Sequence, residues 1–359
     1  MGRAEVPIFS GQRSCRRRAF ITFARAAVPG GTHMTNLKLP RRKFLHLVAG
    51  AAALPALPLI ARAQTYPTRP VRIIVGFAAG GPNDVVARLI GQWLSERLGQ
   101  QFIVENRTGA GGNVATDAVI KAPADGYTLL LVNSSHAVNA NLYEKVDFAH
   151  NIAPIAGLIR TPFVMEVNPS VPTKTVPEFI SYAKTNPGKL NFASGGNGTS
   201  VHVSGELFKM MTGTNLVHVP YRGSAPALTD MIAGQVQVIF DVLTSSLQHV
   251  RSGVLRGLAV TTTTRSDALP ELPTVAEFVP GYESSAWYGV GAPRNTPHEI
   301  IDKLNKEINA GLVDPRLKAR LVELAGTPLP GSPADFGRLV EVEIEKWGRV
   351  VKFANIKPE

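Results

Sequence analysis

From residue 66 onward, short runs of β-branched and aliphatic residues alternate with longer stretches whose apolar residues recur at helical spacing. This alternation is typical of an α/β protein with a mainly parallel sheet. It predicts strands at residues 71–75, 102–105, 129–132, 190–193, 236–240 and 255–260. It also predicts helices over residues 85–98, 113–121, 201–211, 245–250, 297–312 and 333–353.

Several predicted strands end in glycine-rich or polar turns, and open α/β sheets bind ligands at the carboxyl ends of their strands. In the turn at residues 76–84, Pro82 is suited to the first helical position and leaves the amides of residues 79–81, 83 and 84 as donors. Such amides attract anions. Two interpretations stay open: anion binding, or glycines that only permit tight turns. Asp84 is expected to cap amides rather than to contact an anionic ligand.

Two apolar segments, residues 163–167 and 287–292, each precede a proline-containing stretch and are interpreted as strands that cross between two lobes. On this interpretation lobe 1 comprises residues 66–167 plus 290–359, and lobe 2 comprises residues 168–289. The last two helices are expected to pack on lobe 1. Trp287 and Tyr288 could line a pocket, but packing at the hinge is the favoured interpretation.

The N-terminal 63 residues are interpreted as an extension followed by a twin-arginine signal peptide. Arg41-Arg42 precede an apolar stretch at residues 47–60 and a small-x-small site that ends at Ala63. This stretch is shorter than the roughly 20 residues that span a bilayer. Translation is expected to begin at Met34 and cleavage to follow Ala63, which places the mature protein in the periplasm.

The formal net charge of +11 suggests a nucleic-acid partner until its position in the chain is considered. Residues 1–63 hold eleven of the 38 basic residues and one of the 27 acidic residues, so the remainder is close to neutral. The basic surface of a nucleic-acid binder is therefore not expected. The single cysteine, Cys15, lies in the same segment, which excludes disulfides and thiolate sites from the rest of the chain.

Motifs for catalysis and cofactor binding are missing from the sequence. No turn carries a P-loop or the G-x-G-x-x-G order, and no G-x-S-x-G occurs. His136, His202 and His218 lack the paired spacing of metal ligands. The chain is therefore expected to have no catalytic residue, no metal and no cofactor.

Several separated blocks resemble the Bug family, the periplasmic receptors of tripartite tricarboxylate transporters. They are Gly80-Gly81-x-x-Asp84, Asn106-Arg107-x-Gly109-Ala110-Gly111-Gly112, ADGYTLLLV at 124–132, Ser194-Gly195-x-x-Gly198-Thr199-x-x-His202, HVPYRGSAPALTDMIAGQVQVIFD at 218–241 and LPELPTVAEF at 269–278. The resemblance covers most of residues 66–350. It implies an α/β, two-lobed type II periplasmic binding protein fold with two hinge-crossing strands.

The resemblance also implies that the lobes close on a carboxylate held largely by backbone amides and ordered waters. By this resemblance the ligand-binding residues are Phe77, Ala79, Gly80, Gly81, Asn83, Ser134, Ser135, Ser194, Gly198, Thr199, His202, Tyr221, Arg222 and Asp241.

The expected function is that of a monomeric solute-binding protein that captures a small organic acid for membrane transporter subunits. An alternative keeps the same binding lobes but makes the chain a sensor for a membrane histidine kinase. A secreted hydrolase or nucleotide-dependent enzyme is a third possibility, and it requires a triad, metal site or P-loop that the sequence lacks.

Overall fold

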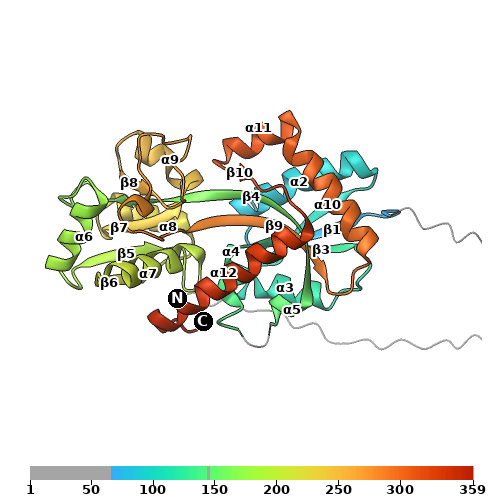
Figure 1. Ribbon diagram of the computed structural model, residues 1–359, viewed down its shortest axis with the longest axis horizontal. Coiled ribbons are helices and arrows are strands. Elements are labelled where there is room, and N and C mark those ends of the chain that lie inside the picture. The colour runs from blue at the N-terminus through green and yellow to red at the C-terminus, as the bar shows by residue number, and fades with distance from the viewer. Residues whose placement is uncertain (1–65, 144–145, 359) are drawn as a thin grey trace, which may run out of the picture. The chain divides into compact units, whose positions relative to one another are not determined.

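The computed structural model describes residues 66–143 and 146–358, in which helices cover both faces of one curled, mixed sheet (Figure 1). The strands are β1 Val71–Val75, β2 Phe102–Asn106, β3 Thr128–Asn133, β4 Ile152–Val167, β5 Leu190–Ser194, β6 Leu216–Pro220, β7 Val238–Val242, β8 Arg256–Val260, β9 Ser285–Pro293 and β10 Thr327–Pro328. The predicted start at Met34, export signal and cleavage after Ala63 lie outside the described residues.

The strands fall into two groups that share β4. The order is β2-β1-β3-β9-β4-β7-β5-β6, with β8 and β10 also paired to β4. β4 pairs with β9 over residues 152–162 and with β7 over residues 163–167. We call the part around β2, β1 and β3 lobe 1 and the part around β7, β5 and β6 lobe 2. This topology confirms the two-lobed α/β fold, while the residue boundaries of the lobes stay a prediction.

The longer helices start and stop where the sequence offers capping groups. In α2, Gly81 is the N-cap, Pro82 opens the helix, and Gly99 closes it in the left-handed conformation. The helices are α2 Pro82–Leu98, α3 Asn113–Ile120, α4 Ser134–Asn139, α5 Phe148–Asn151, α6 Val176–Thr185, α7 Ser200–Thr212, α8 Ser224–Ile232, α9 Leu243–Arg251, α10 His298–Val313, α11 Pro315–Glu323 and α12 Pro333–Ala354, with 3-10 turns at Ala110–Gly112 and Val275–Glu277.

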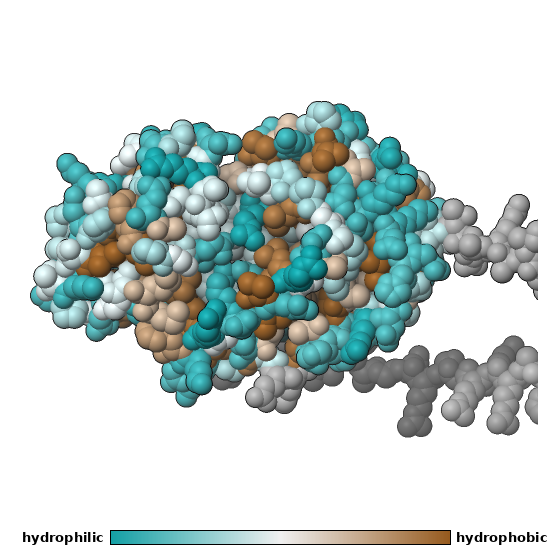
Figure 2. All heavy atoms as spheres, in the orientation of Figure 1, coloured by the Kyte–Doolittle hydropathy of each residue, from teal (hydrophilic) through white to brown (hydrophobic). Residues whose placement is uncertain are grey.

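Neighbouring residues of a strand enter two different hydrophobic cores, because successive side chains point to opposite faces of a sheet. Ile73 belongs to one core and Ile74 to the other. Figure 2 shows one face of the molecule, on which apolar side chains form separate patches among polar ones. Most large apolar side chains are therefore inside, on the two faces of the sheet.

The last helix, α12, extends further across the molecule than the sequence suggests. It was expected to pack on lobe 1, and it does contact α4 and β4. It also contacts α7 of lobe 2 and lies across the crossing strands in Figure 1. The helix therefore bridges the two lobes.

The strand predictions are confirmed for most of the sheet, with three differences. The strand predicted at 236–240 lies at 238–242, so Asp241 is inside it rather than after it. The segment 152–162 forms the first part of β4, although its alanine, proline and glycine residues give no strand signal. The short strands β6 and β10 and the helices α4, α5, α6, α8 and α11 were not predicted.

Candidate functional site

In the turn between β1 and α2, two backbone amides form hydrogen bonds within the turn itself. Gly80 has a φ of +80°, which only glycine adopts easily. Its amide donates to Asp84 Oδ2 at 2.9 Å, and the Gly81 amide donates to the Ala78 carbonyl at 3.4 Å. The expectation that both amides are free donors is therefore wrong. The donors that remain for a ligand are the amide of Ala79, for which no hydrogen bond is described, and those of the first helical turn, such as that of Asn83.

Asp84 has the capping role expected from the sequence. Besides the Gly80 amide, its Oδ2 accepts a hydrogen bond from Arg88 Nε at 2.9 Å. The bond from Arg88, together with the Gly80 amide, lowers the pKa of Asp84 to about 2 despite the opposing effect of burial. Asp84 therefore stays ionised and fixes the shape of the turn.

On the lobe 1 side, Asn133 links Asn83 to the start of α4 at Ser134 and Ser135, while Phe77 lies against the turn at Gly112. The Asn133 side chain donates to Asn83 Oδ1 at 2.5 Å and accepts from the Ser135 amide at 3.1 Å. Ser134 and Ser135 are buried at the start of α4. The Phe77 ring lies close to Gly112, where a Cβ would be 3.3 Å from it.

On the lobe 2 side, three predicted ligand-binding residues direct their polar atoms into their own loop. Ser194 Oγ lies 2.7 Å from His218 Nε2. Thr199 Oγ1 donates to the Gly196 carbonyl at 2.8 Å and caps α7. The Gly198 amide donates to His202 Nδ1 at 3.1 Å, so His202 lies beneath the loop and supports it. These contacts give the side chains a positioning role.

The loop of lobe 2 meets lobe 1 at Gly198. A Cβ on this glycine would lie 2.9 Å from Leu142 Cδ1, and its φ of +69° also favours glycine. The lobe 2 loop therefore contacts lobe 1 at the segment that follows α4.

Two stacked histidines lie under the same loop. The His202 and His218 rings are 3.7 Å apart between centroids and almost parallel. Burial, and then the neighbouring His202, lowers the pKa of His218 to about 3, so the ring is neutral near pH 7. The stacked rings therefore support the loop from below.

The remaining predicted residues lie in lobe 2, where the Tyr221 amide donates to the Ser194 carbonyl at 2.9 Å. Tyr221 donates from its hydroxyl to Asp230, and Arg222 is exposed. Asp241 is fully buried in β7, where it accepts a hydrogen bond from Ser224 Oγ at 2.6 Å. Burial raises the pKa of Asp241 to about 6. No described contact joins Tyr221, Arg222 or Asp241 to the turn at Gly80.

A cavity of about 260 Å³, which we call the hinge cavity, opens beside the turn at Gly80. Residues from both lobes and both crossing strands line it: Gly80, Pro82, Val85, Val86, Ile159, Thr161, Thr244, Ser245, Tyr288 and Leu324. Of the predicted ligand-binding residues, only Gly80 is among them. Trp287 and Tyr288 both pack in the hydrophobic cores, as expected, and Tyr288 also lines the cavity.

The sequence signals for this lining were weak but present. Ile159 and Thr161 alternate along β4, as residues on one face of a strand do. Thr244 and Ser245 lie in the first turn of α9, three and four residues after Asp241. Leu324 ends α11, which was not predicted, and nothing in the local sequence marks it.

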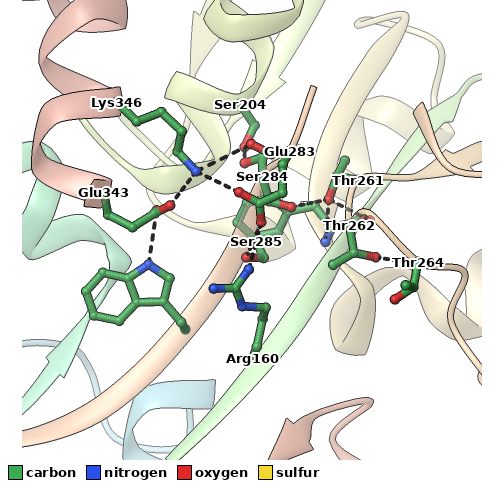
Figure 3. A network of polar contacts seen from close by, with 12 residues as sticks. Arg160, Ser204, Thr261, Thr262, Thr264, Glu283, Ser284, Ser285, Glu343 and Lys346 are labelled. Atoms are coloured by element: carbon green, nitrogen blue, oxygen red, sulfur yellow. Dashed lines mark hydrogen bonds and ion pairs between the residues drawn. The ribbon is translucent and has the colours of Figure 1, made fainter. Parts of the chain in front are cut away.

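The opposite face of the crossing strands carries a network of charged groups (Figure 3). Glu283 lies between Arg160 and Lys346, at 3.1 and 2.8 Å. Glu343 of α12 accepts from the indoles of Trp287 and Trp347 at 3.1 and 2.8 Å, and it also pairs with Lys346. The network fastens α12 to β4 and β9.

Within residues 66–143 and 146–358, no group of three or more His, Cys, Asp or Glu side chains is arranged to hold a metal ion. In the same part of the chain, no helix is both long enough and apolar enough to cross a membrane.

The sequence model of the tripartite tricarboxylate transporter family receptor matches residues 86–356. The chain belongs to this receptor family. Among relatives, protein BugT of Bordetella pertussis is 36% identical over 300 residues, which cover 82% of this chain and 92% of BugT. The match to BugT supports the predicted membership of the Bug group.

Two solved structures of this receptor family cover almost the same part of the chain. The R. palustris protein Rpa4515 with adipate is 42% identical, with a TM-score of 0.74, and covers 82% of this chain and 100% of its own. MatC from Rhodopseudomonas palustris with bound malate is 32% identical, with a TM-score of 0.70, and covers 80% of this chain and 100% of its own. Both are structures of the two-lobed fold with a small carboxylate.

Proposed function

We propose that the chain is an extracytoplasmic receptor that captures a small carboxylate between its lobes and delivers it to membrane transporter subunits. Membership of the receptor family carries this proposal. Its support is the presence of adipate and malate in two relatives that match over the whole of their own length. Transport rather than sensing is favoured because the family takes its name from transporters.

We further propose that capture works by hinge motion of the lobes about β4 and β9. The ligand carboxylate would accept hydrogen bonds from first-turn amides of α2 and face the buried start of α4. The lobe 2 loop at residues 194–199 would close over it. The proposed ligand-binding set remains the predicted one, with His202 and Ser194 as supports for the loop. In this account the receptor acts as a monomer, without catalysis, cofactor or nucleic acid.

Export is part of the same proposal. A receptor that serves a membrane transporter must reach the periplasm, and the twin-arginine pattern before Ala63 offers the route. Mass spectrometry of the protein from the periplasmic fraction should find an N-terminus near Gln64. An intact Met1 terminus on the exported protein would contradict the signal-peptide proposal.

Isothermal titration calorimetry against aliphatic mono-, di- and tricarboxylates, aromatic acids and amino acids tests the receptor function. We expect binding of at least one carboxylate with a 1:1 stoichiometry. The uncharged analogue, in which an amide replaces the carboxylate, is the matched control and should not bind. Absence of binding by every anion at millimolar concentration would contradict the proposal.

A further inference from the structure

The hinge cavity begins at the turn that is proposed to hold the carboxylate. Gly80 and Pro82 belong both to that turn and to the cavity lining. A ligand whose carboxylate lies at the first turn of α2 would therefore extend the rest of its body into the cavity. The residues that line the cavity then determine which ligands fit beyond the carboxylate.

Part of the lining of the hinge cavity is apolar. Val85 and Val86 of α2 face it, together with Ile159 of β4 and Leu324 at the end of α11. Contact with this surface removes apolar ligand area from water, which is favourable by about 25 cal/mol per Å². These apolar lining residues therefore favour a ligand with a hydrocarbon chain or ring.

The rest of the lining includes hydroxyl-bearing residues: Thr161, Thr244, Ser245 and Tyr288. Thr244 Oγ1 is buried and has no hydrogen-bond partner among the described residues. A buried hydroxyl without a partner is costly, so a ligand atom that bonds with it would be favoured. The lining therefore has a place for one neutral polar group.

No Lys, Arg, His, Asp or Glu is among the described residues that line the cavity. A second ligand carboxylate there would lose water without gaining a cation, which is strongly unfavourable. Behind α9, the buried Asp241 adds to this effect when it is ionised, and its Oδ2 lies 3.4 Å from Ser246 Oγ, which donates to Glu166 at 2.5 Å. Asp241 also lies close enough to raise the pKa of Tyr288, although burial is the larger cause.

We propose that the hinge cavity selects monocarboxylates with an uncharged, mainly apolar body, aliphatic or aromatic, that has room for one neutral polar group. This inference rests on the proposed function, since it assumes that a carboxylate is held at the turn beside Gly80. It distinguishes this chain from its relatives with adipate and malate, which are dicarboxylates.

Hexanoate and adipate are the matched probes, because they have the same chain length and differ by one carboxylate. Calorimetry on the full chain should give hexanoate an affinity at least about tenfold above that of adipate. Adipate binding as tightly as hexanoate, or more tightly, would overturn the inference and leave the receptor function standing. Binding of no carboxylate at all would overturn the receptor function and the inference with it.

A paired substitution locates the selection in the cavity. Leu324→Lys puts a cation on the apolar wall, whereas Val322→Lys puts it two residues away on an exposed position of the same helix. The first variant should lower the preference for hexanoate over adipate by at least about tenfold, and the second should keep it. Equal preferences in the two variants, both with wild-type melting temperatures, would overturn the assignment to this cavity.

Discussion

The two faces of the crossing strands differ in how they use charge. At one level of the hinge, β4 and β9 pair Ile159 with Tyr288 and Arg160 with Trp287. Ile159 and Tyr288 line the hinge cavity, which has no charged lining residue among those described. Arg160 and Trp287 belong instead to the network with Glu283, Glu343 and Lys346.

This difference shows how a receptor can keep a stable hinge and a selective cavity on the same two strands. Buried charges are costly unless each has a partner, and in the network each carboxylate has several. Behind the strands such groups fix α12 in place. On the cavity face of the strands, an unpaired charged side chain would change which ligands can bind. Because successive side chains of a strand point to opposite faces, neighbouring residues of β4 and β9 can hold α12 on one face and line the cavity on the other.

Of the changes considered, breaking the charged network should have the largest effect, and that effect should be on the free energy of unfolding. Glu343→Ala leaves Lys346 with one carboxylate fewer and leaves the indoles of Trp287 and Trp347 without their acceptor. We expect the free energy of unfolding to fall by about 3–5 kcal/mol. Chemical denaturation monitored by tryptophan fluorescence measures this, with Glu345→Ala, at an exposed position of the same helix, as the control. Equal losses in the two variants would mean that the network does not stabilise the hinge.

Blocking the ligand face should affect binding instead of stability. Gly81 has an ordinary φ of −77°, and a Cβ there would only meet the Ala78 carbonyl oxygen at 3.4 Å. Gly81→Ala should therefore bind nearly as the wild type does. Gly81→Trp fills the mouth of the turn and should weaken carboxylate binding by about 100-fold, or roughly 2.7 kcal/mol, with little change in melting temperature. Unchanged affinity in Gly81→Trp would place the site elsewhere.

Asp241, the buried acid behind the cavity, should make the stability of the protein depend on pH. The pKa of Asp241 rises from 3.8 to about 6 on folding because the carboxyl is buried. Its contribution to stability is therefore complete below about pH 4 and is lost as the pH rises to about 6. Asp241→Asn should remove this loss, which amounts to about 2 kcal/mol.

Comparison of the two proteins by urea denaturation at pH 4 and pH 6 isolates the effect of Asp241. The comparison with Asp241→Asn is needed because His136 changes the stability of both proteins in the opposite direction. Burial lowers the pKa of His136 to about 4, so its contribution to stability is lost as the pH falls. Parallel stability curves for wild type and Asp241→Asn would show that Asp241 ionises as freely when folded as when unfolded.

Much of the fold could be predicted from local sequence patterns. The predicted strand at 71–75 and the turn to α2 are confirmed because β-branched runs, glycines and Pro82 act locally. The first half of β4 could not be predicted, since its strand structure depends on pairing with β9, more than a hundred residues away. Tertiary pairing overrides weak local preference there.

The candidate site was predictable to a smaller extent. Glycines and serines at strand ends indicated candidate turns, and Asn133 does link the turn at Asn83 to the start of α4 at Ser135. The sequence could not indicate that the Gly80 amide is taken by Asp84, because this depends on side-chain direction. It also could not place Leu324 in the cavity, since that contact joins distant parts of the chain.

The central claim is that a carboxylate lies at the first turn of α2 with its body in the hinge cavity. A crystal structure of the protein with hexanoate, or with the tightest carboxylate found by calorimetry, tests it most directly. The account predicts carboxylate oxygens within hydrogen-bond distance of first-turn amides such as that of Asn83, and carbon atoms against Ile159 and Leu324. A ligand bound away from both the turn and the cavity would contradict it.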